Sequence, residues 1–231
     1  MSSIAASLSR RLHAWSKARS RRNLYRWLEQ AVAEHRLREG GAILNIGAGG
    51  VIAERLREAG VAARSVDVDA ARAPDLVADV EDLAMLADAS IDAVVMMEVL
   101  EHVRRPDRAV GELRRVLKPG GIVIGSTPFL LGIHDQPYDY YRYTLHGLNW
   151  LFREFTALTV RERNGYFAAV AVLVLRCYAT GATRQRRLAL LLAPLLVPLA
   201  LVLECLDALL PSLAATTGYF FIYRKPAGDG A

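Results

Sequence analysis

The middle of the chain, from about residue 41 to residue 127, alternates short apolar runs with stretches whose apolar residues recur every three or four positions. The short runs predict buried strands, and the recurring spacing predicts amphipathic helices. The expected strands lie at 42–46, 62–67, 75–78, 91–97 and 121–127, and the expected helices lie at 51–59, 81–86 and 106–117. Strands and helices that alternate in this way are typical of parallel α/β units, with helices on both faces of one sheet.

The pattern continues toward the C-terminus with fewer elements. A helix is expected at about 144–154, with Thr144 as its N-cap, and a strand is expected at about 156–163. The last strand is expected at 219–223. Between these two strands lies a long apolar insertion at about 166–213.

The insertion contains an uncharged run of 16 residues, Leu188 to Leu203. As a straight helix this run would be ~24 Å long, which is shorter than a hydrocarbon core of ~30 Å. Pro194 and Pro198 are expected to kink or break it, and residues 167–175 are expected to pair with it as a helical hairpin. We therefore expect a hairpin that lies on a membrane surface without spanning the membrane. The alternative is that both helices cover the sheet.

The N-terminal segment is basic and amphipathic. Its first 28 residues carry seven basic and no acidic side chains, so the remainder of a chain of net charge +5 sums to −2. Apolar residues recur at helical spacing through Leu12, Trp15, Leu24 and Leu28, so residues 1–38 are expected to form a helical segment. Three roles are open: a helix over the ligand pocket, a helix that contacts a membrane surface or another anionic partner, and a targeting segment.

Residues 39–231 are expected to form one domain, since 231 residues with 53% apolar content suffice for a single large core. Cys177 and Cys205 lie in apolar stretches without metal-binding or redox spacing. We therefore expect buried thiols and no metal site. The protein is expected to be cytoplasmic. It would be peripheral at the inner face of the membrane if its apolar and basic segments bind lipid. Because the domain is slightly acidic, no nucleic-acid partner is expected.

Residues 43–50 form an apolar strand that runs directly into a Gly-Ala-Gly-Gly turn, and a helix-forming run follows. Glycines allow positive φ and let a ligand approach the main chain closely. A dinucleotide fingerprint would have a third glycine where Ile52 stands, so a nicotinamide cofactor is disfavoured. Asp67, at the end of the second strand, is positioned to accept hydrogen bonds from a ribose; Asp69 is the alternative. The pattern indicates an adenosine without a pyrophosphate.

Five short motifs follow one another: I-L-N-I-G-A-G-G at 43–50, S-V-D-V-D at 65–69, A-D-V-E-D-L at 78–83, M-E-V-L-E-H-V at 97–103 and L-K-P-G-G at 117–121. In this order they resemble the class I S-adenosylmethionine-dependent methyltransferases, in particular the small-molecule, type 11-like group. The resemblance implies S-adenosyl-L-methionine as the cofactor. It also implies a Rossmann-like doubly wound sheet of about seven strands in the order 3-2-1-4-5-7-6, the last strand antiparallel. The apolar helical insertion between the last two strands is an addition to that fold.

The resemblance further implies which residues bind the cofactor. Asp67 would bind the ribose diol, Asp79 the adenine amino group, and Met97 and Glu98 the methionine portion. The alternative for Asp79 is that it only caps the N-terminus of the helix expected at 81–86. The full cofactor-binding set is Asn45, Gly47, Ala48, Gly49, Gly50, Asp67, Val68, Asp79, Val80, Met97 and Glu98.

A polar and aromatic segment, residues 134–143, follows the fifth strand and contains one His, two Asp, one Arg and four Tyr. Such a loop at the carboxyl end of a strand is a pocket candidate. It resembles the H-x-x-P-Y-D-Y-x-R-Y/F-T segment of one methyltransferase subgroup. His134 is the candidate general base for a hydroxyl acceptor, because an ordinary pKa of ~6.5 suits proton removal near neutrality. Tyr140 and Arg142 are expected to act in substrate binding, and His102 is expected to be a local structural residue. The alternative is a loop whose charged side chains pair only with one another.

The sequence therefore predicts an enzyme that methylates a small-molecule or lipid-linked acceptor, at oxygen. The alternative function is a catalytically silent, methyltransferase-like binding or scaffold protein at the membrane surface. Two departures from the family pattern keep this alternative open. An acid is usual where Asn45 stands, and a glycine is usual where Val51 stands.

Overall fold

The computed structural model describes residues 3–176 and 191–228. The chain divides into two compact units. The unit that contains most of the sheet consists of Arg26–Pro128, Ile133–Arg161 and Tyr219–Ala231, and the other consists of Met1–Tyr25, Phe129–Gly132 and Glu162–Gly218. One long helix, α1 (Ser3–Glu34), contributes residues to both units.

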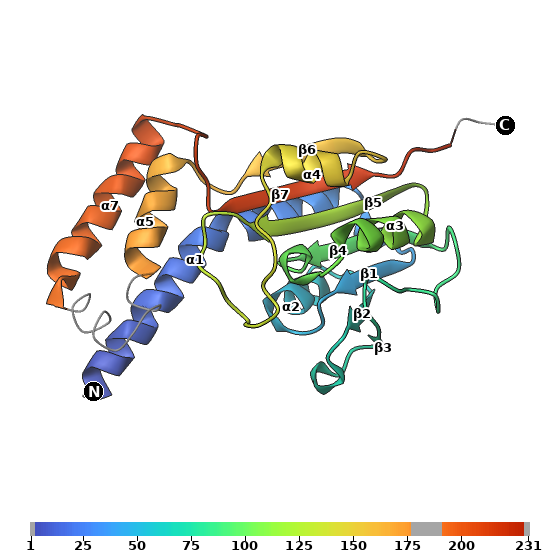
Figure 1. The fold of residues 1–231 in the computed structure, drawn as a ribbon, viewed down its shortest axis with the longest axis horizontal. Helices are drawn as coiled ribbons and strands as arrows, with labels where there is room; N and C mark the ends of the chain where they lie inside the picture. The colour runs from blue at the N-terminus through green and yellow to red at the C-terminus, as the bar shows by residue number, and fades with distance from the viewer. Residues whose placement is uncertain (1–2, 177–190, 229–231) are drawn as a thin grey trace. The chain divides into compact units, whose positions relative to one another are not determined.

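Seven strands form one sheet in the part of the chain that the structure describes, in the order β3-β2-β1-β4-β5-β7-β6 (Figure 1). They are β1 Ile43–Ile46, β2 Ala63–Asp67, β3 Leu76–Val77, β4 Ile91–Met97, β5 Leu117–Pro128, β6 Thr156–Glu162 and β7 Gly218–Arg224. The first five strands pair in parallel. β7 runs antiparallel to β5, since Gly120 near the start of β5 bonds to Lys225 just beyond the end of β7. The predicted strand order and the antiparallel last strand are confirmed.

The helices of the sheet unit begin and end close to the predicted residues. They are α2 Gly50–Glu58, α3 Pro106–Val116 and α4 Leu145–Leu151, with 3-10 turns η1 Leu37–Glu39, η2 Ala70–Arg72 and η3 Leu100–His102. The Thr144 hydroxyl accepts a hydrogen bond from the Gly147 amide, so Thr144 caps α4 as predicted. The second part of α1 also packs in this unit, where Leu28 and Val32 are buried and the Trp27 ring lies 5.7 Å from that of Phe220.

The helix predicted at 81–86 is wrong, because this segment consists of turns. The carboxylate of Asp79 accepts a hydrogen bond from the Glu81 amide, and that of Asp82 accepts one from the Ala84 amide. Aspartates that bond to the amide two residues ahead compete with a helix for the same donors. Leu83 is nevertheless fully buried, so its apolar character reflects burial of a turn.

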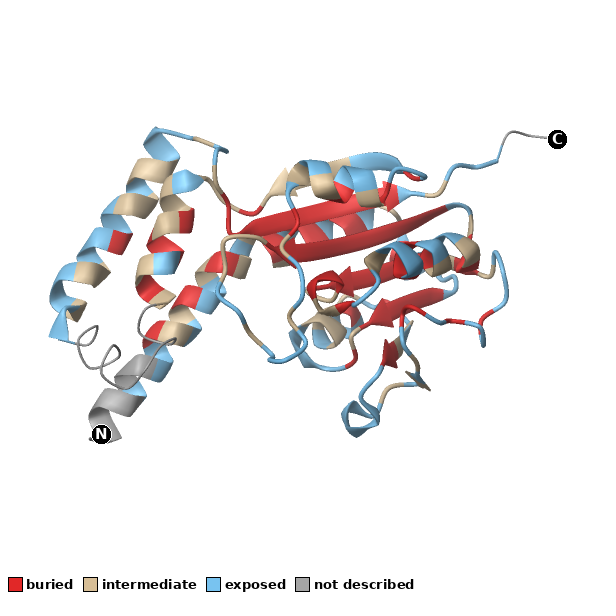
Figure 2. Ribbon diagram, in the orientation of Figure 1, coloured by how far each residue is buried: buried red, intermediate tan, exposed pale blue. Residues whose placement is uncertain are grey.

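Close packing at the centre of the sheet depends on one glycine. A Cβ at Gly125 of β5 would lie 2.3 Å from the ring of Phe221 on β7. Next to this contact, the rings of Phe152 and Tyr223 are stacked with centroids 4.4 Å apart. Figure 2 shows β5 and β7 as almost continuously buried. The carboxyl end of β5 is therefore closely packed against β7.

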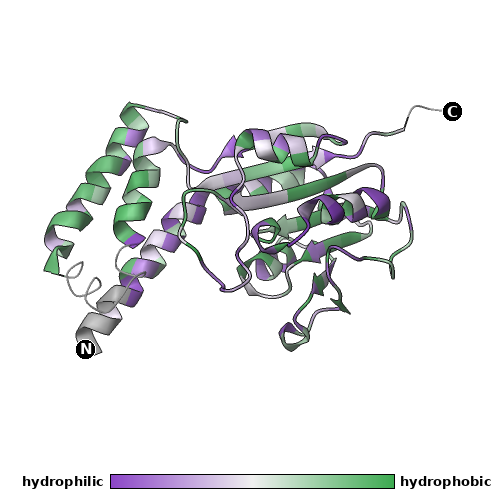
Figure 3. Cartoon of the chain, viewed as in Figure 1, coloured by the Kyte–Doolittle hydropathy of each residue, from purple (hydrophilic) through white to green (hydrophobic). Residues whose placement is uncertain are grey.

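The other unit is helical. α5 (Tyr166–Arg176) and α7 (Ala193–Leu209) lie side by side and are largely hydrophobic (Figure 3). Their shared core contains Leu12, Ala171, Leu175 and Ala200, and the carboxylate of Asp207 accepts hydrogen bonds from the amides of Gly165 and Ala168. Arg19 of α1 forms an ion pair with Glu204 of α7. The predicted pairing of two apolar segments therefore occurs as a packed helix pair.

Two details of this unit differ from the predictions. α7 continues through Pro198, so this proline does not break the helix. Cys205 is exposed and not buried, because only a narrow face of an otherwise apolar helix is covered. The predictions for Cys177 and for Leu188 to Leu190 lie outside the described residues. Within the described residues, no helix is both long and apolar enough to cross a membrane.

Candidate active site

The glycine turn lies between β1 and α2, at the carboxyl edge of the sheet. Gly47, Gly49 and Gly50 have φ values of 92°, 79° and 68°, which disfavour residues with a Cβ. A Cβ at Gly49 or Gly50 would meet no atom within 4 Å. The main chain of this turn is thus open to a ligand, and the structure fits the predicted close approach.

Asp67 ends β2 directly beside this turn. One carboxylate oxygen accepts a hydrogen bond from the Ala48 amide at 2.8 Å, and the other accepts one from the Asp69 amide at 2.9 Å. The side chain is 8% exposed, and the Arg72 guanidinium lies 3.6 Å away. Each carboxylate oxygen can accept a further hydrogen bond. The carboxylate is therefore held in one orientation and keeps acceptor capacity that a ligand could use.

Asn45 lies under the turn, opposite Ser65 of β2 and Val95 of β4. Its side-chain amide donates a hydrogen bond to the Gly47 carbonyl at 3.3 Å. Its side-chain oxygen is buried and has no donor among the described residues. Buried amide oxygens are usually paired, so this atom is available to a donor from a ligand.

The residues predicted to contact the adenine lie at the end of β3. Asp79 is exposed, and its carboxylate accepts a hydrogen bond from the Glu81 amide; the predicted alternative of a helix N-cap is wrong because this bond closes a turn. Val80 is buried, whereas Val68 after β2 is 67% exposed. The second carboxylate oxygen of Asp79 is compatible with a contact to a ligand, because capping uses only one.

Met97 and Glu98 end β4. Glu98 has φ = 57°, a left-handed conformation that is uncommon for a residue other than glycine. Its amide donates to the Ser126 carbonyl, and its carboxylate accepts a hydrogen bond from the Ser126 hydroxyl at 3.0 Å. Strained conformations of this kind are often kept at functional sites. Glu98 is therefore held in one position at the carboxyl edge of the sheet.

The segment after β5 is organised by Asp139. Its carboxylate accepts two hydrogen bonds from the Arg142 guanidinium, at 2.5 and 2.6 Å, and these lower the pKa of Asp139 to about 2. The same carboxylate accepts a hydrogen bond from the His134 amide and lies 3.3 Å from His134 Nδ1. Arg142 is thus engaged within the loop, as the self-paired alternative expects, and it positions the loop.

Backbone bonds tie this loop to η3. The amides of Tyr140 and Tyr141 both donate to the Glu101 carbonyl, and His102 Nδ1 lies 2.8 Å from the Tyr138 carbonyl. The Tyr140 hydroxyl accepts a hydrogen bond from Arg104. The loop therefore presents its tyrosine side chains beside the end of β4.

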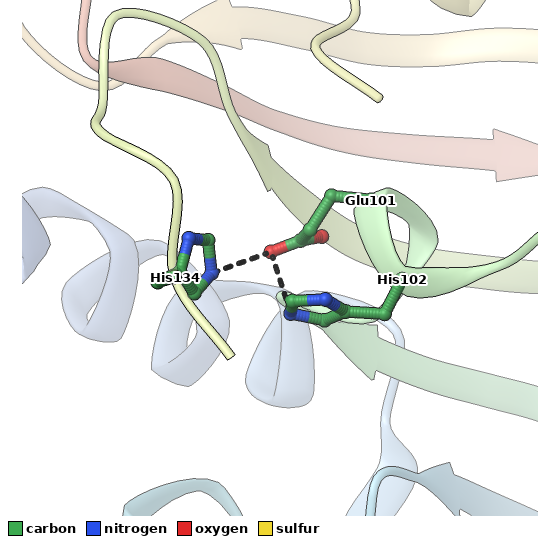
Figure 4. A group of neighbouring side chains, drawn as sticks. All are labelled: Glu101, His102 and His134. Atoms are coloured by element: carbon green, nitrogen blue, oxygen red, sulfur yellow. Dashed lines mark ion pairs between the residues drawn. The ribbon is translucent and has the colours of Figure 1, made fainter. Parts of the chain in front are cut away.

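Glu101, His102 and His134 form a cluster that sequence reasoning missed (Figure 4). Glu101 Oε1 lies 3.7 Å from His102 Nε2 and 3.8 Å from His134 Nε2. The Glu101 side chain is fully buried, and burial raises the pKa of its carboxyl group. The signal was present in the M-E-V-L-E-H-V motif and in His134, but only the folded chain brings the two together.

A family model described as a methyltransferase domain matches residues 44–125. Over residues 44–125 the chain is similar to a methyltransferase domain. This range contains β1, β2, β3, β4 and most of β5, and with them every predicted cofactor-binding residue.

Curated methyltransferases are similar to this chain over part of their own length. The ubiquinone biosynthesis O-methyltransferase of Xanthomonas oryzae pv. oryzae is 36% identical over 107 residues, which are 38% of this chain and 43% of that protein. The chain therefore spans less than half the length of this curated relative. A similarity over this share of the relative does not determine the acceptor of this chain.

Two solved structures share the fold. The [4+2]-cyclase SpnF has a TM-score of 0.57 and 22% identity, covering 87% of this chain and 80% of that one. A SAM dependent methyltransferase from Archaeoglobus fulgidus has a TM-score of 0.56 and 14% identity, covering 87% and 94%. Because a cyclase shares the fold of the methyltransferase domain, the chemistry must be argued from the site.

Proposed function

We propose that this chain transfers the methyl group of S-adenosylmethionine to an oxygen of a small-molecule or lipid-linked acceptor. The observation that carries the proposal is the Asp67 carboxylate, held by two backbone amides beside an open glycine turn in a methyltransferase domain. S-adenosylmethionine supplies a methyl group already activated on a sulfonium. The protein must then align the reactants, exclude water and remove a proton.

The residues at the carboxyl edge of the sheet fit this cofactor. Asp67 would accept hydrogen bonds from both ribose hydroxyls, and the backbone of Gly47 to Gly50 would lie against the methionine and ribose portions. The unpaired side-chain oxygen of Asn45 would accept a hydrogen bond from the same end of the cofactor. Val68, Asp79 and Val80 would line the adenine side. Met97 and Glu98 would lie below the sulfonium.

His134 is the residue we propose for proton removal. Its Nδ1 faces the Asp139 carboxylate at 3.3 Å, so in the neutral ring the proton would be on Nδ1 and Nε2 would carry the lone pair. A histidine oriented by a carboxylate is a suitable general base. Asp139 is in turn fixed by Arg142. Arg142 would therefore keep Asp139 in position beside His134. Tyr140 would contribute to the acceptor-binding surface.

Methylation at oxygen is supported by the similarity to the relative from Xanthomonas, which is a ubiquinone biosynthesis O-methyltransferase. Oxygen acceptors carry a proton that must leave, which gives His134 a role that a thioether or a tertiary amine would not need. The acceptor is then a hydroxyl compound that fits beside the exposed tyrosines of the loop.

Incubation with S-adenosylmethionine carrying an isotope-labelled methyl group tests the proposal. Cell extract is added, and labelled products are identified by mass spectrometry. We expect label in hydroxyl-derived methyl ethers, with S-adenosylhomocysteine formed in equal amount. A protein that neither transfers label nor binds S-adenosylmethionine by calorimetry would instead be the silent, scaffold-like alternative.

We also propose that the helical unit attaches the enzyme to an anionic membrane surface. Several leucines of α7 and the turn before it are exposed, among them Leu191 at 77%, Leu195 at 67% and Leu209 at 74%. Apolar patches of this kind are common at interaction sites. The first 28 residues add seven basic side chains, each worth ~1 kcal/mol near an anionic surface.

The full-length protein is expected to float with vesicles that contain phosphatidylglycerol. The double variant Leu195→Glu/Leu199→Glu should float less, because it introduces charge into the apolar face of α7. Val77→Glu, a change at an exposed position of β3, serves as the matched control. Equal flotation of all three proteins, or none with the intact chain, would rule out this attachment.

A further inference from the structure

Two side chains of η3, Glu101 and His102, lie close to one side chain of the loop after β5, His134. The carboxylate oxygen of Glu101 and the ring nitrogens of His102 and His134 all lie within 4.8 Å of one another (Figure 4). Within the described residues, no other group of three or more such side chains has this proximity.

Both histidines present an unprotonated nitrogen toward Glu101. His102 Nδ1 lies 2.8 Å from the Tyr138 carbonyl oxygen, which can only accept, so Nδ1 carries the proton. His134 Nδ1 faces the Asp139 carboxylate at 3.3 Å, with the same result. The lone pair of Nε2 is therefore directed at Glu101 in each case. A second nitrogen fixed by a carbonyl or a carboxylate is the usual arrangement of a metal-binding histidine.

The Glu101 carboxylate is buried and, in the part of the chain that the structure describes, is approached only by the two histidine rings, at ion-pair distance. The side chain is fully buried, and neither oxygen accepts a hydrogen bond from the described residues. Buried carboxylates are normally paired or bound to a cation. The distances of 3.7 and 3.8 Å to the two histidine nitrogens are too long for hydrogen bonds. The cluster brings one carboxylate and two imidazoles, the ligand types of transition-metal sites, to one point.

A metal ion fits between these atoms. Two ligands bound at ~2.0–2.2 Å in tetrahedral geometry lie ~3.3–3.6 Å apart. The observed separations of 3.7 and 3.8 Å exceed this by a few tenths of an ångström, which small side-chain rotations can remove. Two imidazoles and one carboxylate favour a first-row transition metal over Mg²⁺ or Ca²⁺, which prefer oxygen ligands.

We propose that Glu101, His102 and His134 bind a divalent transition-metal ion of the zinc class, with a remaining coordination position open to the acceptor oxygen. This inference rests on the proposed function for its role and refines it. A hydroxyl bound to the ion has a lowered pKa and releases its proton to solvent water, so His134 then acts as a ligand and not as the base. The new O–C bond forms as the S–CH₃ bond of the donor breaks, and that bonding pair remains on sulfur.

Metal titration of the untagged, chelator-treated full-length chain tests the proposal. The protein carries Cys177→Ser and Cys205→Ser, so that thiols do not bind the ion. Zn²⁺ is titrated in competition with a chromophoric chelator, and Co²⁺ is followed by its visible absorption. We expect one ion per chain. His102→Ala and His134→Ala should each weaken binding by more than the ~10–100-fold cost of losing an outer-shell partner.

Three further variants make the result specific. Glu101→Gln keeps the shape of the side chain and should also lose the site. Asp139→Asn removes only the carboxylate behind His134, so its loss of affinity should be smaller, at ~10–100-fold. His146→Ala, at an exposed position of α4, should bind as the parent protein does. Circular dichroism and thermal melting establish that each variant is folded.

The proposal is overturned if the parent protein binds Zn²⁺ no more tightly than folded Glu101→Gln. It is equally overturned if His146→Ala weakens binding as much as His102→Ala. The outcome is separate from that of the proposed function. Absence of a zinc site in a chain that still transfers label would remove the cation and leave methyl transfer in place. A zinc site in a chain that does not bind S-adenosylmethionine would keep the proposed cation site and rule out methyl transfer.

Discussion

Replacing His134 with alanine is expected to lower the rate of methyl transfer by ~10²-fold or more, while the affinity for S-adenosylmethionine is unchanged. His134 faces the Asp139 carboxylate through Nδ1 and the buried Glu101 through Nε2, and it lies outside the predicted cofactor-binding set. Its loss removes either the base or one metal ligand, and both roles serve the acceptor oxygen. The rate is measured as labelled methyl transferred from S-adenosylmethionine to the acceptors in cell extract.

His146→Ala is the matched control for this prediction, because its side chain is exposed on α4. An unchanged rate in His134→Ala would assign His134 to loop structure alone. The two roles are separated by metal affinity. A rate that falls in parallel with Zn²⁺ affinity, in this variant and in Asp139→Asn, identifies a ligand. A fall in rate without a change in Zn²⁺ binding identifies a base.

Asp67→Ala is expected to weaken the binding of S-adenosylmethionine and S-adenosylhomocysteine by roughly 1 to 3 kcal/mol, through loss of hydrogen bonds to a charged acceptor. The loss of affinity has two causes in this structure. The carboxylate would bind the ribose, and it also holds the Ala48 amide of the glycine turn and the Asp69 amide. Calorimetry with both ligands measures the loss.

Asp69→Ala is the control, because Asp69 is exposed, caps η2 through the Ala71 amide and otherwise pairs, among the described residues, only with the exposed Arg72. Its affinity for the cofactor should remain near that of the parent chain. Equal losses in the two variants would move the ribose contact to Asp69 or indicate a general disturbance of the turn. Competition by NAD would contradict the assignment of the cofactor itself.

Most of the fold could be predicted because local and tertiary preferences agree. The apolar runs within β1, β4 and β5 are buried, so these strands could be located from sequence. Residues 81–86 carry a similar apolar signal, but aspartate side chains compete for the helical amides there. The spacing of apolar residues indicates which positions are buried. It does not indicate which backbone amide an aspartate carboxylate will bind.

The site was predictable only where one short segment contains the information. The glycine turn and Asp67 follow from spacing along two adjacent strands. The convergence of His102 with His134 depends on how the loop after β5 folds back onto η3, which no periodicity encodes. In the same way, the exposure of Cys205 depends on which face of the uniformly apolar α7 is covered.

The loop after β5 is fastened to η3 through main-chain atoms. The Tyr140 and Tyr141 amides and the Tyr138 carbonyl make the bonds, while the three side chains are exposed by 39%, 39% and 55% respectively. Evolution can therefore exchange these side chains without detaching the loop. A library that randomises positions 138, 140 and 141 would lose the tyrosine hydroxyl contacts to Arg104 but keep the main-chain bonds, and would search acceptor preference on a loop that those bonds still attach.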